Sequence, residues 1–542
     1  AEEAAPDGPP AVEIDLAGIE RRAVAFPVPE ARYARLGATA GAVLISSVPV
    51  TGVRAAARHE RSDDRTLERF DLNTLELSPV ASGVTDFAVG ADHTTLLYLA
   101  GERLRVVKAG ERPAEDKSEP GRASGWVDLG RVKVRVHPDA EWRQMFREAW
   151  RLQREDFWVE DMSGIDWDEV YARYLPLVDR VSTRAEFSDL LWEVQGELGT
   201  SHAYEQGGAY RQGPHYRQGF LGVDWRLDAE TGAHRLARVY QGDTWSAEAT
   251  SPLNRPGLGV RAGDEVLAVN GLPVGGRSTA AELLVSQAGQ EVALVVRDGG
   301  EPRTVTVRAL DDERPVRYRD WVAGNRALVH ERTGGRVGYL HVPDMLGWGY
   351  AEFHRGFLAE FDREALVVDV RYNRGGHASG LLLQRLIPRR LGYGYPRWGV
   401  PAPYPLEAVR GPLVAIANEH CGSDGDIFCH AFKALGLGPL VGRRTWGGVI
   451  GIWPRHALAD GTVTTQPGFS FGFDDVGWRV ENYGTDPTVP VDIAPQDYAR
   501  GHDTQLHEAV EQALAELARR PAHSPDPAVR PRLARVPLPP RS

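Results

Sequence analysis

Residues 419–427 read Glu419-His420-Cys421-Gly422-Ser423-Asp424-Gly425-Asp426-Ile427. An apolar run over residues 412–417, Pro-Leu-Val-Ala-Ile-Ala, precedes them and predicts a buried strand. The apolar residues that follow recur at helical spacing, namely Ile427, Phe428, Ala431 and Leu435. We therefore expect Ser423 at a strand-to-helix turn, where helix N–H groups beside its hydroxyl can bind an anion.

Two interpretations of this turn are open from the segment alone. A serine nucleophile needs such a turn, because nearby N–H groups can stabilise the oxyanion that forms during its attack. Alternatively, Ser423 and Asp424 only cap the helix, as Ser and Asp often do. The rest of the chain has to decide between them.

The composition limits the class of protein. A chain of 542 residues is too long for one core, so we expect three or four domains. The net charge of −12 is spread out and no basic stripe suggests nucleic acid. No apolar run is long enough to span a bilayer, and residues 1–10 lack the pattern of a signal peptide.

Cysteine usage favours a reducing compartment. Cys421 and Cys429 are the only cysteines, so the chain has no disulfide framework. They lie eight residues apart across the turn and the following helix, where we expect no bridge.

The first 135 residues are expected to form β-structure. Residues 1–12 are rich in Ala, Glu and Pro and are expected to be loose. The runs 33–46 and 84–99 are weakly alike at a spacing of roughly fifty residues, a period compatible with propeller blades. Two blades cannot close a propeller, so this part is a remnant, an edge or the end of a larger one. Further strand-like runs lie at 41–45, 94–99 and 103–107.

Residues 136–212 are expected to form a helical domain. Thr183 and Glu186 make a capping-box pattern ahead of a helix that Gly199 should end. Ser201 and His202 follow directly. An earlier helical stripe runs through Trp142, Met145, Phe146, Ala149 and Trp150.

Residues 213–312 contain a turn, a strand and a hairpin in sequence. Residues 257–271 read Gly-Leu-Gly-Val-Arg-Ala-Gly-Asp-Glu-Val-Leu-Ala-Val-Asn-Gly, ending in an Asn-Gly hairpin turn. This order resembles the PDZ family, and the alternative is a plain hairpin. The resemblance implies a loop whose backbone N–H groups hold a peptide C-terminus, formed by Phe220, Leu221 and Gly222.

Residues 313–520 alternate predicted strands and helices, which is an α/β layer pattern. Strand-like runs lie at 337–342, 365–370 and 413–416, and the last helix carries Leu506, Val510, Leu514 and Leu517. Residues 521–542 contain seven prolines and are expected to be disordered.

Four pieces of this sequence carry chemistry, and each is weak alone. A single histidine is more often structural, paired glycines are usually a turn, and a lone glutamate is usually solvated. Together they supply a nucleophile, a base, an orienting partner and unobstructed N–H donors. The pieces are Ser423, the pair Ser201-His202, the double glycine Gly375-Gly376 after a strand, and Glu481.

Their order resembles the Tricorn protease family over nearly all of residues 13–515. The resemblance implies a multidomain fold: the end of a β-propeller, a helical domain, a PDZ-like β-barrel domain and an α/β peptidase domain of the crotonase/ClpP-like type. By the same resemblance, Ser423 is the nucleophile and His202 the general base. Ser201 hydrogen-bonds that histidine and is itself held by Glu481. The oxyanion hole would be the N–H of Asp424 with that of Gly375 or Gly376.

The resemblance also implies an activity and an assembly. It implies a cytoplasmic serine peptidase that shortens oligopeptides downstream of the proteasome, within a homohexamer. No metal or organic cofactor is implied, and neither a His-Glu-x-x-His signature nor a phosphate-binding loop occurs. The competing hypothesis is an inactive, PDZ-containing peptide-binding scaffold. That hypothesis predicts a substitution at one or more catalytic positions, and none is substituted.

Lysine scarcity argues against a near rival. Related C-terminal processing proteases use a Ser–Lys dyad, but Lys433 is the only lysine after Ser423. Ten residues along one helix place the two about 15 Å apart, so His202 is the better base.

The chain departs from the family in two respects. Family members carry two complete propellers before the helical domain, and only the final part of the second is present. Archaeal members place an aspartate after the double-glycine strand for a basic P1 side chain, whereas residues 377–406 contain no Asp or Glu. A basic P1 preference is therefore not predicted. A more apolar pocket is expected instead, lined by Tyr393, Tyr395 and Trp398.

Overall fold

The computed structural model describes residues 13–48, 65–113, 119–211, 213–275, 278–526, 528, 530–531, 533–535 and 540. The segment 1–12, expected to be loose, lies outside the described residues. The chain divides into two compact units, Ala1–Arg135 and Val136–Ser542.

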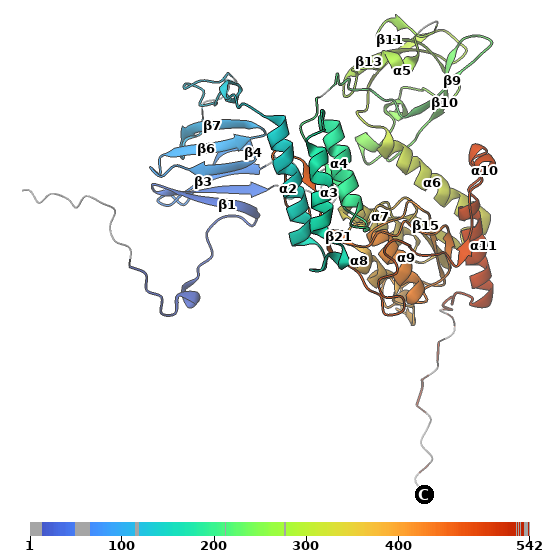
Figure 1. Cartoon of the computed structure of the whole chain (residues 1–542). Coiled ribbons are helices and arrows are strands. Elements are labelled where there is room, and N and C mark those ends of the chain that lie inside the picture. The colour runs from blue at the N-terminus through green and yellow to red at the C-terminus, as the bar shows by residue number, and fades with distance from the viewer. Residues whose placement is uncertain are drawn as a thin grey trace, which may run out of the picture. The chain divides into compact units, whose positions relative to one another are not determined.

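The first unit consists of antiparallel strands in two sheets (Figure 1). Leu44, Phe87 and Leu96 belong to one core to which both sheets contribute. The strands predicted at 41–45, 94–99 and 103–107 are confirmed. In spatial order the sheets are β1 (Arg32–Thr39), β2 (Ala42–Val48), β3 (Arg65–Asp71) and β4 (Leu77–Val84), then β5 (Asp86–Val89), β6 (Thr95–Ala100) and β7 (Arg103–Lys108).

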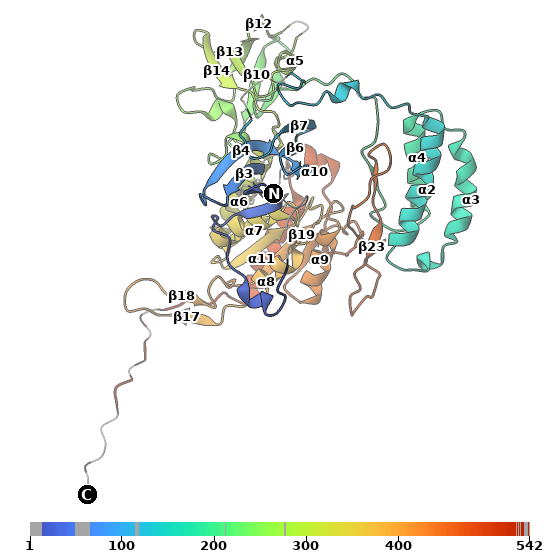
Figure 2. The ribbon, with the colours of Figure 1, turned by 90° about the vertical axis from the view of Figure 1, so that its left-hand side faces the viewer.

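The second unit begins with three helices that lie side by side (Figure 1, Figure 2). Met145, Phe146 and Phe187 are buried in the core between them, as the apolar stripes predict. The helices are α2 (Pro138–Asp156), α3 (Trp167–Val178) and α4 (Arg184–Gly196).

The start of α4 was predicted correctly and its end was not. The capping box of Thr183 and Glu186 is present. The helix stops at Gly196 rather than at Gly199, because the N–H groups of residues 197–199 bond three residues back instead of four. This tightened turn leads directly into Ser201 and His202.

The next module is a curled antiparallel sheet with the strand order β14-β13-β11-β10-β9. Asn270 and Gly271 both have positive φ and turn β11 into β12, as the Asn-Gly hairpin predicts. Phe220 and Leu310 lie just outside the two edge strands and exchange backbone hydrogen bonds, so the sheet nearly closes on itself. The elements are β9 (Val223–Leu227), β10 (His234–Val239), β11 (Glu265–Val269), β12 (Leu272–Pro273), α5 (Ala280–Leu283), β13 (Glu291–Arg297) and β14 (Arg303–Arg308).

A parallel sheet in the order β15-β16-β19-β20-β24 forms the centre of the last module. Its strands are β15 (Val337–His341), β16 (Ala365–Asp369), β19 (Leu413–Ala417), β20 (Leu440–Gly442) and β24 (Val489–Pro490). One face packs on α7 (Gly347–Glu360), α8 (Ser379–Leu386) and α9 (Asp424–Ala434). The other packs on α6 (Arg314–Thr333) and α11 (Thr504–Arg519), which confirms the α/β layer prediction. Smaller elements are β17 (Gly392–Gly394), β18 (Ala402–Tyr404), β21 (Gly451–Ile452), β23 (Pro467–Phe469) and α10 (Pro495–Ala499).

The C-terminal segment is ordered further than the proline content predicts. Ala522 packs on the core beside α11, and the carbonyl of His523 accepts hydrogen bonds from Tyr393 and Arg410. The expected disorder from residue 521 is therefore wrong for the first residues of that segment.

A buried ion pair fixes the end of β16, from which the double glycine follows. Asp369 is 0% exposed and accepts bonds from the Arg371 guanidinium and from the Tyr339 hydroxyl at 2.9 Å. Arg371 also pairs with Asp503, which caps α11. Because both charges of the main pair are buried, each depends on the other for its stability.

Replacing Asp369 with Asn should destabilise the second unit. The change leaves the Arg371 guanidinium buried without its main partner, which costs about 3–5 kcal/mol. Calorimetry should show a lower unfolding temperature for this unit. Arg385→Gln, which breaks an exposed ion pair with Glu407, is the matched control and should cost less than about 1 kcal/mol. Equal effects of the two variants would contradict the role given to the buried pair.

Candidate active site

Ser423 occupies the turn between β19 and α9, as predicted. Its φ of 58° and ψ of −124° lie in a region that serine rarely adopts. Although Ser423 stands at the N-cap position of α9, its side chain makes no capping hydrogen bond. The alternative that Ser423 only caps the helix is therefore wrong.

The hydroxyl of Ser423 instead faces His202, which is 221 residues away in sequence. His202 Nε2 lies 3.2 Å from Ser423 Oγ, and the histidine is 8% exposed. A short antiparallel pair of β8 (Glu205–Gln206) and β22 (Val463–Thr464) holds the chain beyond His202 against the α/β module. Thr465 reinforces this junction, because its hydroxyl donates to the His202 carbonyl and accepts from the Tyr204 N–H.

Ser201 and Glu481 fix the proton on the imidazole. Ser201 Oγ lies 2.8 Å from His202 Nδ1 and 3.1 Å from Glu481 Oε2. A carboxylate can only accept, so the Ser201 hydroxyl donates to Glu481 and accepts from Nδ1–H. We assign the Nδ1–H tautomer on this basis, which leaves the Nε2 lone pair facing Ser423.

Glu481 is held by a segment that the sequence did not single out. Its Oε2 accepts from the N–H groups of Val449, at 2.6 Å, and Ile450, at 3.0 Å, while Oε1 accepts from Ser201 N–H at 2.7 Å. Residues 445–450, which we call the strap, thus connect to His202 through Glu481 and Ser201. Trp446 in the strap also packs edge-on against the His202 ring.

The other end of the strap is bound to α9, the helix that follows Ser423. Asp426 in the first turn of α9 accepts from Gly447 N–H at 2.9 Å and from Gly448 N–H at 3.2 Å. Four consecutive backbone amides therefore bridge Asp426 and Glu481. Almost every residue has a backbone N–H group, so the sequence does not single out the strap. Only Asp426, the last acidic residue of the 419–427 turn, could have suggested this role.

The backbone N–H groups next to Ser423 differ in whether they are free to bind an oxyanion. The N–H of Gly375 donates to Asn373 Oδ1 at 2.9 Å and is therefore engaged. Among the described residues, the N–H groups of Gly376 and Asp424 have no hydrogen-bond partner. Of the two glycines, Gly376 is accordingly the better oxyanion donor. The Asp424 carboxylate is bound by Ser379 at the start of α8.

Both glycines are required by close approach. A Cβ on Gly375 would lie 2.4 Å from Ser423 Cβ, and one on Gly376 would lie 2.1 Å from the Met345 carbonyl oxygen. Positive φ at both positions adds to this requirement.

Burial shifts two pKa values at the site in opposite directions. Burial lowers the pKa of His202 below its ordinary 6.5, and the nearby Glu481 charge partly opposes this. Burial raises the pKa of Asp426 to about 6, although hydrogen bonds from the strap oppose that shift. His202 is therefore neutral near pH 7, as a general base must be.

Among the described residues, the remaining predicted residues make no hydrogen bond to the Ser423 hydroxyl. Lys433 donates to the Asp486 carbonyl, in agreement with the exclusion of a Ser–Lys dyad. Cys421 and Cys429 are buried and free, with their sulfur atoms 3.9 Å apart. Trp398 is 80% exposed, and the expected apolar pocket stays a prediction.

The predicted PDZ loop lies at the edge of the curled sheet. Phe220 is paired with Leu310, Leu221 is buried, and Gly222 has a φ of 64°. None of the three hydrogen-bonds to a residue of the Ser423 site.

Among the described residues, no group of three His, Cys, Asp or Glu side chains is arranged to hold a metal ion. No helix in the same part of the chain is long and apolar enough to cross a membrane.

Three family models match the chain. Residues 138–196 match the Tricorn protease C1 domain, residues 219–312 the Tricorn protease PDZ domain, and residues 336–491 peptidase family S41. The matched segments contain Ser423 and Glu481, and Ser201-His202 lie between the first two.

Relatives cover nearly all of this chain. It is 48% identical over 523 residues to Tricorn protease homolog 1 of Streptomyces coelicolor, covering 95% of this chain and 48% of the relative. It is 43% identical over 507 residues to a Tricorn-like protease C-terminal subunit of Sulfurisphaera tokodaii, covering 93% and 58%. A crystal structure of the tricorn protease superposes with a TM-score of 0.85 at 37% identity, covering 94% of this chain and 49% of that one. The chain spans about half the length of the curated relatives that it matches.

Removing the Glu481 charge should move the pH dependence of Ser423 reactivity. The reaction of Ser423 with a fluorophosphonate requires neutral His202. The wild-type rate should therefore fall as the pH drops through the pKa of His202, which burial holds below 6.5. The Glu481 charge raises the pKa of His202, so Glu481→Gln should shift this limb to still lower pH and reduce the maximal rate. Labelling reactions quenched at successive times, at a series of pH values, give the dependence of the rate on pH. An acidic limb that stays at the same pH or moves to higher pH would contradict the assigned relay, which is the hydrogen-bonded series Glu481, Ser201 and His202.

Replacing Asp426 with Asn should weaken the site without unfolding it. Asn places an NH₂ group, which cannot accept a hydrogen bond, against one of the two strap N–H groups. The charge-assisted hydrogen bond lost there is worth about 1.5–3 kcal/mol, so labelling of Ser423 should slow about tenfold to a hundredfold. The folded-state pKa of Asp426 lies above its ordinary 3.8, so the wild type loses stability as the pH rises from about 4 to about 6. The variant should lack this loss in calorimetry. Unchanged labelling would exclude a positioning role.

Proposed function

Because the chain belongs to the Tricorn protease family, we propose that it is a serine peptidase that cleaves oligopeptides. The observation that carries the proposal is the 3.2 Å separation of Ser423 Oγ and His202 Nε2, with Ser201 and Glu481 aligned behind the imidazole. A buried, neutral histidine with its lone pair on a strained serine is the arrangement that nucleophilic acyl transfer needs.

The first half of the reaction forms an acyl-enzyme. Ser423 Oγ attacks the peptide carbonyl carbon while His202 Nε2 takes the hydroxyl proton. The carbonyl oxygen becomes negative and accepts hydrogen bonds from the N–H groups of Gly376 and Asp424. His202 then gives its proton to the leaving amine, and the C–N bond breaks.

Water completes the reaction by the reverse sequence. His202 takes a proton from water, whose oxygen attacks the ester carbonyl. The tetrahedral species collapses, Ser423 recovers its proton from His202, and a peptide with a free carboxylate leaves. Throughout, the charge of Glu481 stabilises the imidazolium through the Ser201 hydroxyl.

The wider organisation follows the family. We assign residues 1–135 to the end of a β-propeller, 136–212 to a helical domain, 213–312 to the PDZ-like domain and 313–520 to the peptidase domain. Phe220, Leu221 and Gly222 would receive a peptide C-terminus at the PDZ-like domain. Assembly as a homohexamer in the cytoplasm, acting on peptides downstream of the proteasome, completes the proposal.

Labelling with a fluorophosphonate probe tests the activity. Wild type should label at one site, Ser423→Ala should not label, and His202→Ala should label at least a hundredfold more slowly because the general base is gone. Ser182→Ala and His456→Ala, both exposed and outside the hydrogen bonds described around Ser423, are matched controls that should label like wild type. Folded, assembled wild type that does not label would favour the inactive, PDZ-containing peptide-binding scaffold instead.

A further inference from the structure

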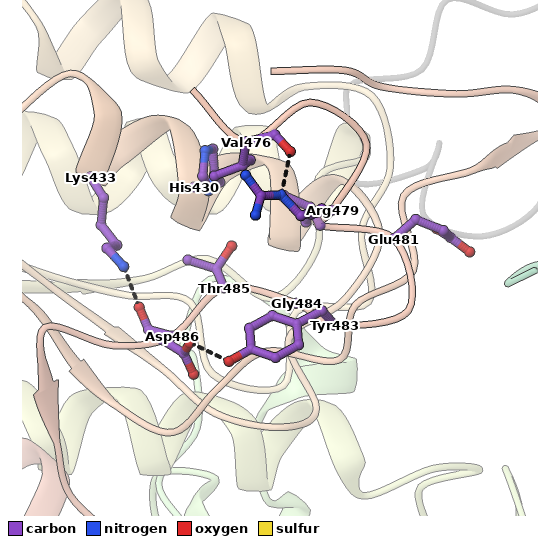
Figure 3. Close-up of a pocket in the computed structure, with 10 residues that line it drawn as sticks. His430, Lys433, Val476, Arg479, Glu481, Tyr483, Gly484, Thr485 and Asp486 are labelled. Carbon is purple, nitrogen blue, oxygen red and sulfur yellow. Dashed lines mark hydrogen bonds between the residues drawn. The ribbon is translucent and has the colours of Figure 1, made fainter. Parts of the chain in front are cut away.

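A cavity of about 490 Å³ lies behind the loop that carries Glu481 (Figure 3). Its walls come from α9 and from residues 476–486. The Glu481 carboxylate points away from the other lining side chains in Figure 3, toward its partners Ser201, Val449 and Ile450. The volume falls in the range of about 300–1,000 Å³ that small-molecule sites occupy. The cavity is thus adjacent to the proposed catalytic relay but separate from it.

Two basic side chains of the lining, Lys433 and Arg479, bind backbone carbonyls instead of carboxylates. Arg479 donates its Nε–H to the Val476 carbonyl, and Lys433 donates to the Asp486 carbonyl. Among the described residues, neither side chain forms an ion pair. The Asp486 carboxylate is already bound by Arg444 and by the Tyr483 hydroxyl. An anion could therefore accept hydrogen bonds from Arg479 and Lys433 without displacing a charged partner.

A buried hydroxyl in the wall has no partner. Thr485 is 2% exposed, and its Oγ1 has no hydrogen bond within the described chain, although its N–H donates to Thr445. Leaving such a group unsatisfied costs about 1–3 kcal/mol, so it is rare in native proteins. In Figure 3 the Thr485 hydroxyl lies on the side that faces Arg479. The oxygen itself has almost no accessible surface, so a ligand carboxylate becomes its partner when a neighbouring side chain of the wall moves aside.

We propose that this cavity binds the terminal carboxylate of a short peptide whose last residue is apolar. Arg479, Lys433 and Thr485 would hold the carboxylate. Val476 and Val480 supply apolar wall for the side chain. This apolar surface favours a peptide over a bare inorganic anion, since a phosphate ion would leave it unused.

A ligand in the cavity would restrain the loop that carries Glu481. Arg479 and Thr485 lie on either side of Glu481 in sequence, so a ligand held by both restrains the loop at two points. A ligand can shift a conformational equilibrium only by binding one state better, and here the favoured state has Glu481 in place. This consequence rests on the proposed peptidase function. A peptidase that releases carboxylates would then respond to its own class of product.

Calorimetric titration with N-acetyl-leucyl-leucine tests the binding. The wild type should bind this peptide at least tenfold more tightly than its C-terminal amide. Arg479→Gln and Thr485→Val should each weaken binding at least tenfold, and Thr485→Val removes no existing hydrogen bond, so it should fold normally. Arg500→Gln, an exposed arginine outside the cavity, is the matched control. Equal affinity for acid and amide, or unchanged affinity in both variants, would overturn the proposal, as would tighter binding of inorganic phosphate.

The effect on Ser423 is measured separately with the fluorophosphonate probe. Saturating peptide should raise the labelling rate of wild type severalfold and leave that of Arg479→Gln unchanged. Binding without this increase would overturn the coupling to Glu481. If no protein labels, the proposed peptidase function fails, while the titration still decides whether the cavity binds a peptide carboxylate.

Discussion

The carboxylate of Glu481 is the interaction on which the rest of the site depends. It accepts hydrogen bonds from Ser201 N–H and Oγ–H and from the N–H groups of Val449 and Ile450. These donors come from the helical segment and from the strap, so one side chain joins parts that are distant in sequence. The direction of the Ser201 hydroxyl sets the His202 tautomer, and the tautomer sets which lone pair faces Ser423. Without a carboxylate at this point, the imidazole would have no preferred proton position.

The parallel sheet supplies the second constraint. The carboxyl ends of adjacent parallel strands meet at one edge, where ligand sites of α/β proteins form. β16 leads into Gly375-Gly376 and β19 into Ser423, so neighbouring strands bring the double glycine beside Ser423. The buried pair of Asp369 and Arg371 holds the end of β16. Asp426 binds α9 to one end of the strap, and the other end of the strap binds Glu481.

The local sequence pattern was sufficient to predict many of the helices and strands. Much of the site depends instead on residues that are far apart in the sequence. Apolar runs located β15, β16 and β19, and the capping box located the start of α4, because these signals depend on neighbouring residues. The approach of His202 to Ser423 spans 221 residues, and only the resemblance to Tricorn proteases suggested it. The strap was missed because it acts through backbone N–H groups, which every residue except proline has. Asp426 was missed because those N–H groups are the partners of its carboxylate. The choice of Gly376 over Gly375 depended on Asn373, whose side chain occupies the other N–H.

A crystal structure of the phosphonylated protein would test the central arrangement most directly. The account predicts a phosphorus–oxygen bond to Ser423 Oγ and one phosphonyl oxygen within about 3.1 Å of the N–H nitrogens of both Gly376 and Asp424. His202 should remain bonded to Ser201, and Ser201 to Glu481. A phosphonyl oxygen directed away from both N–H groups, or a His202 ring turned away from Ser201 in the adduct, would contradict the account.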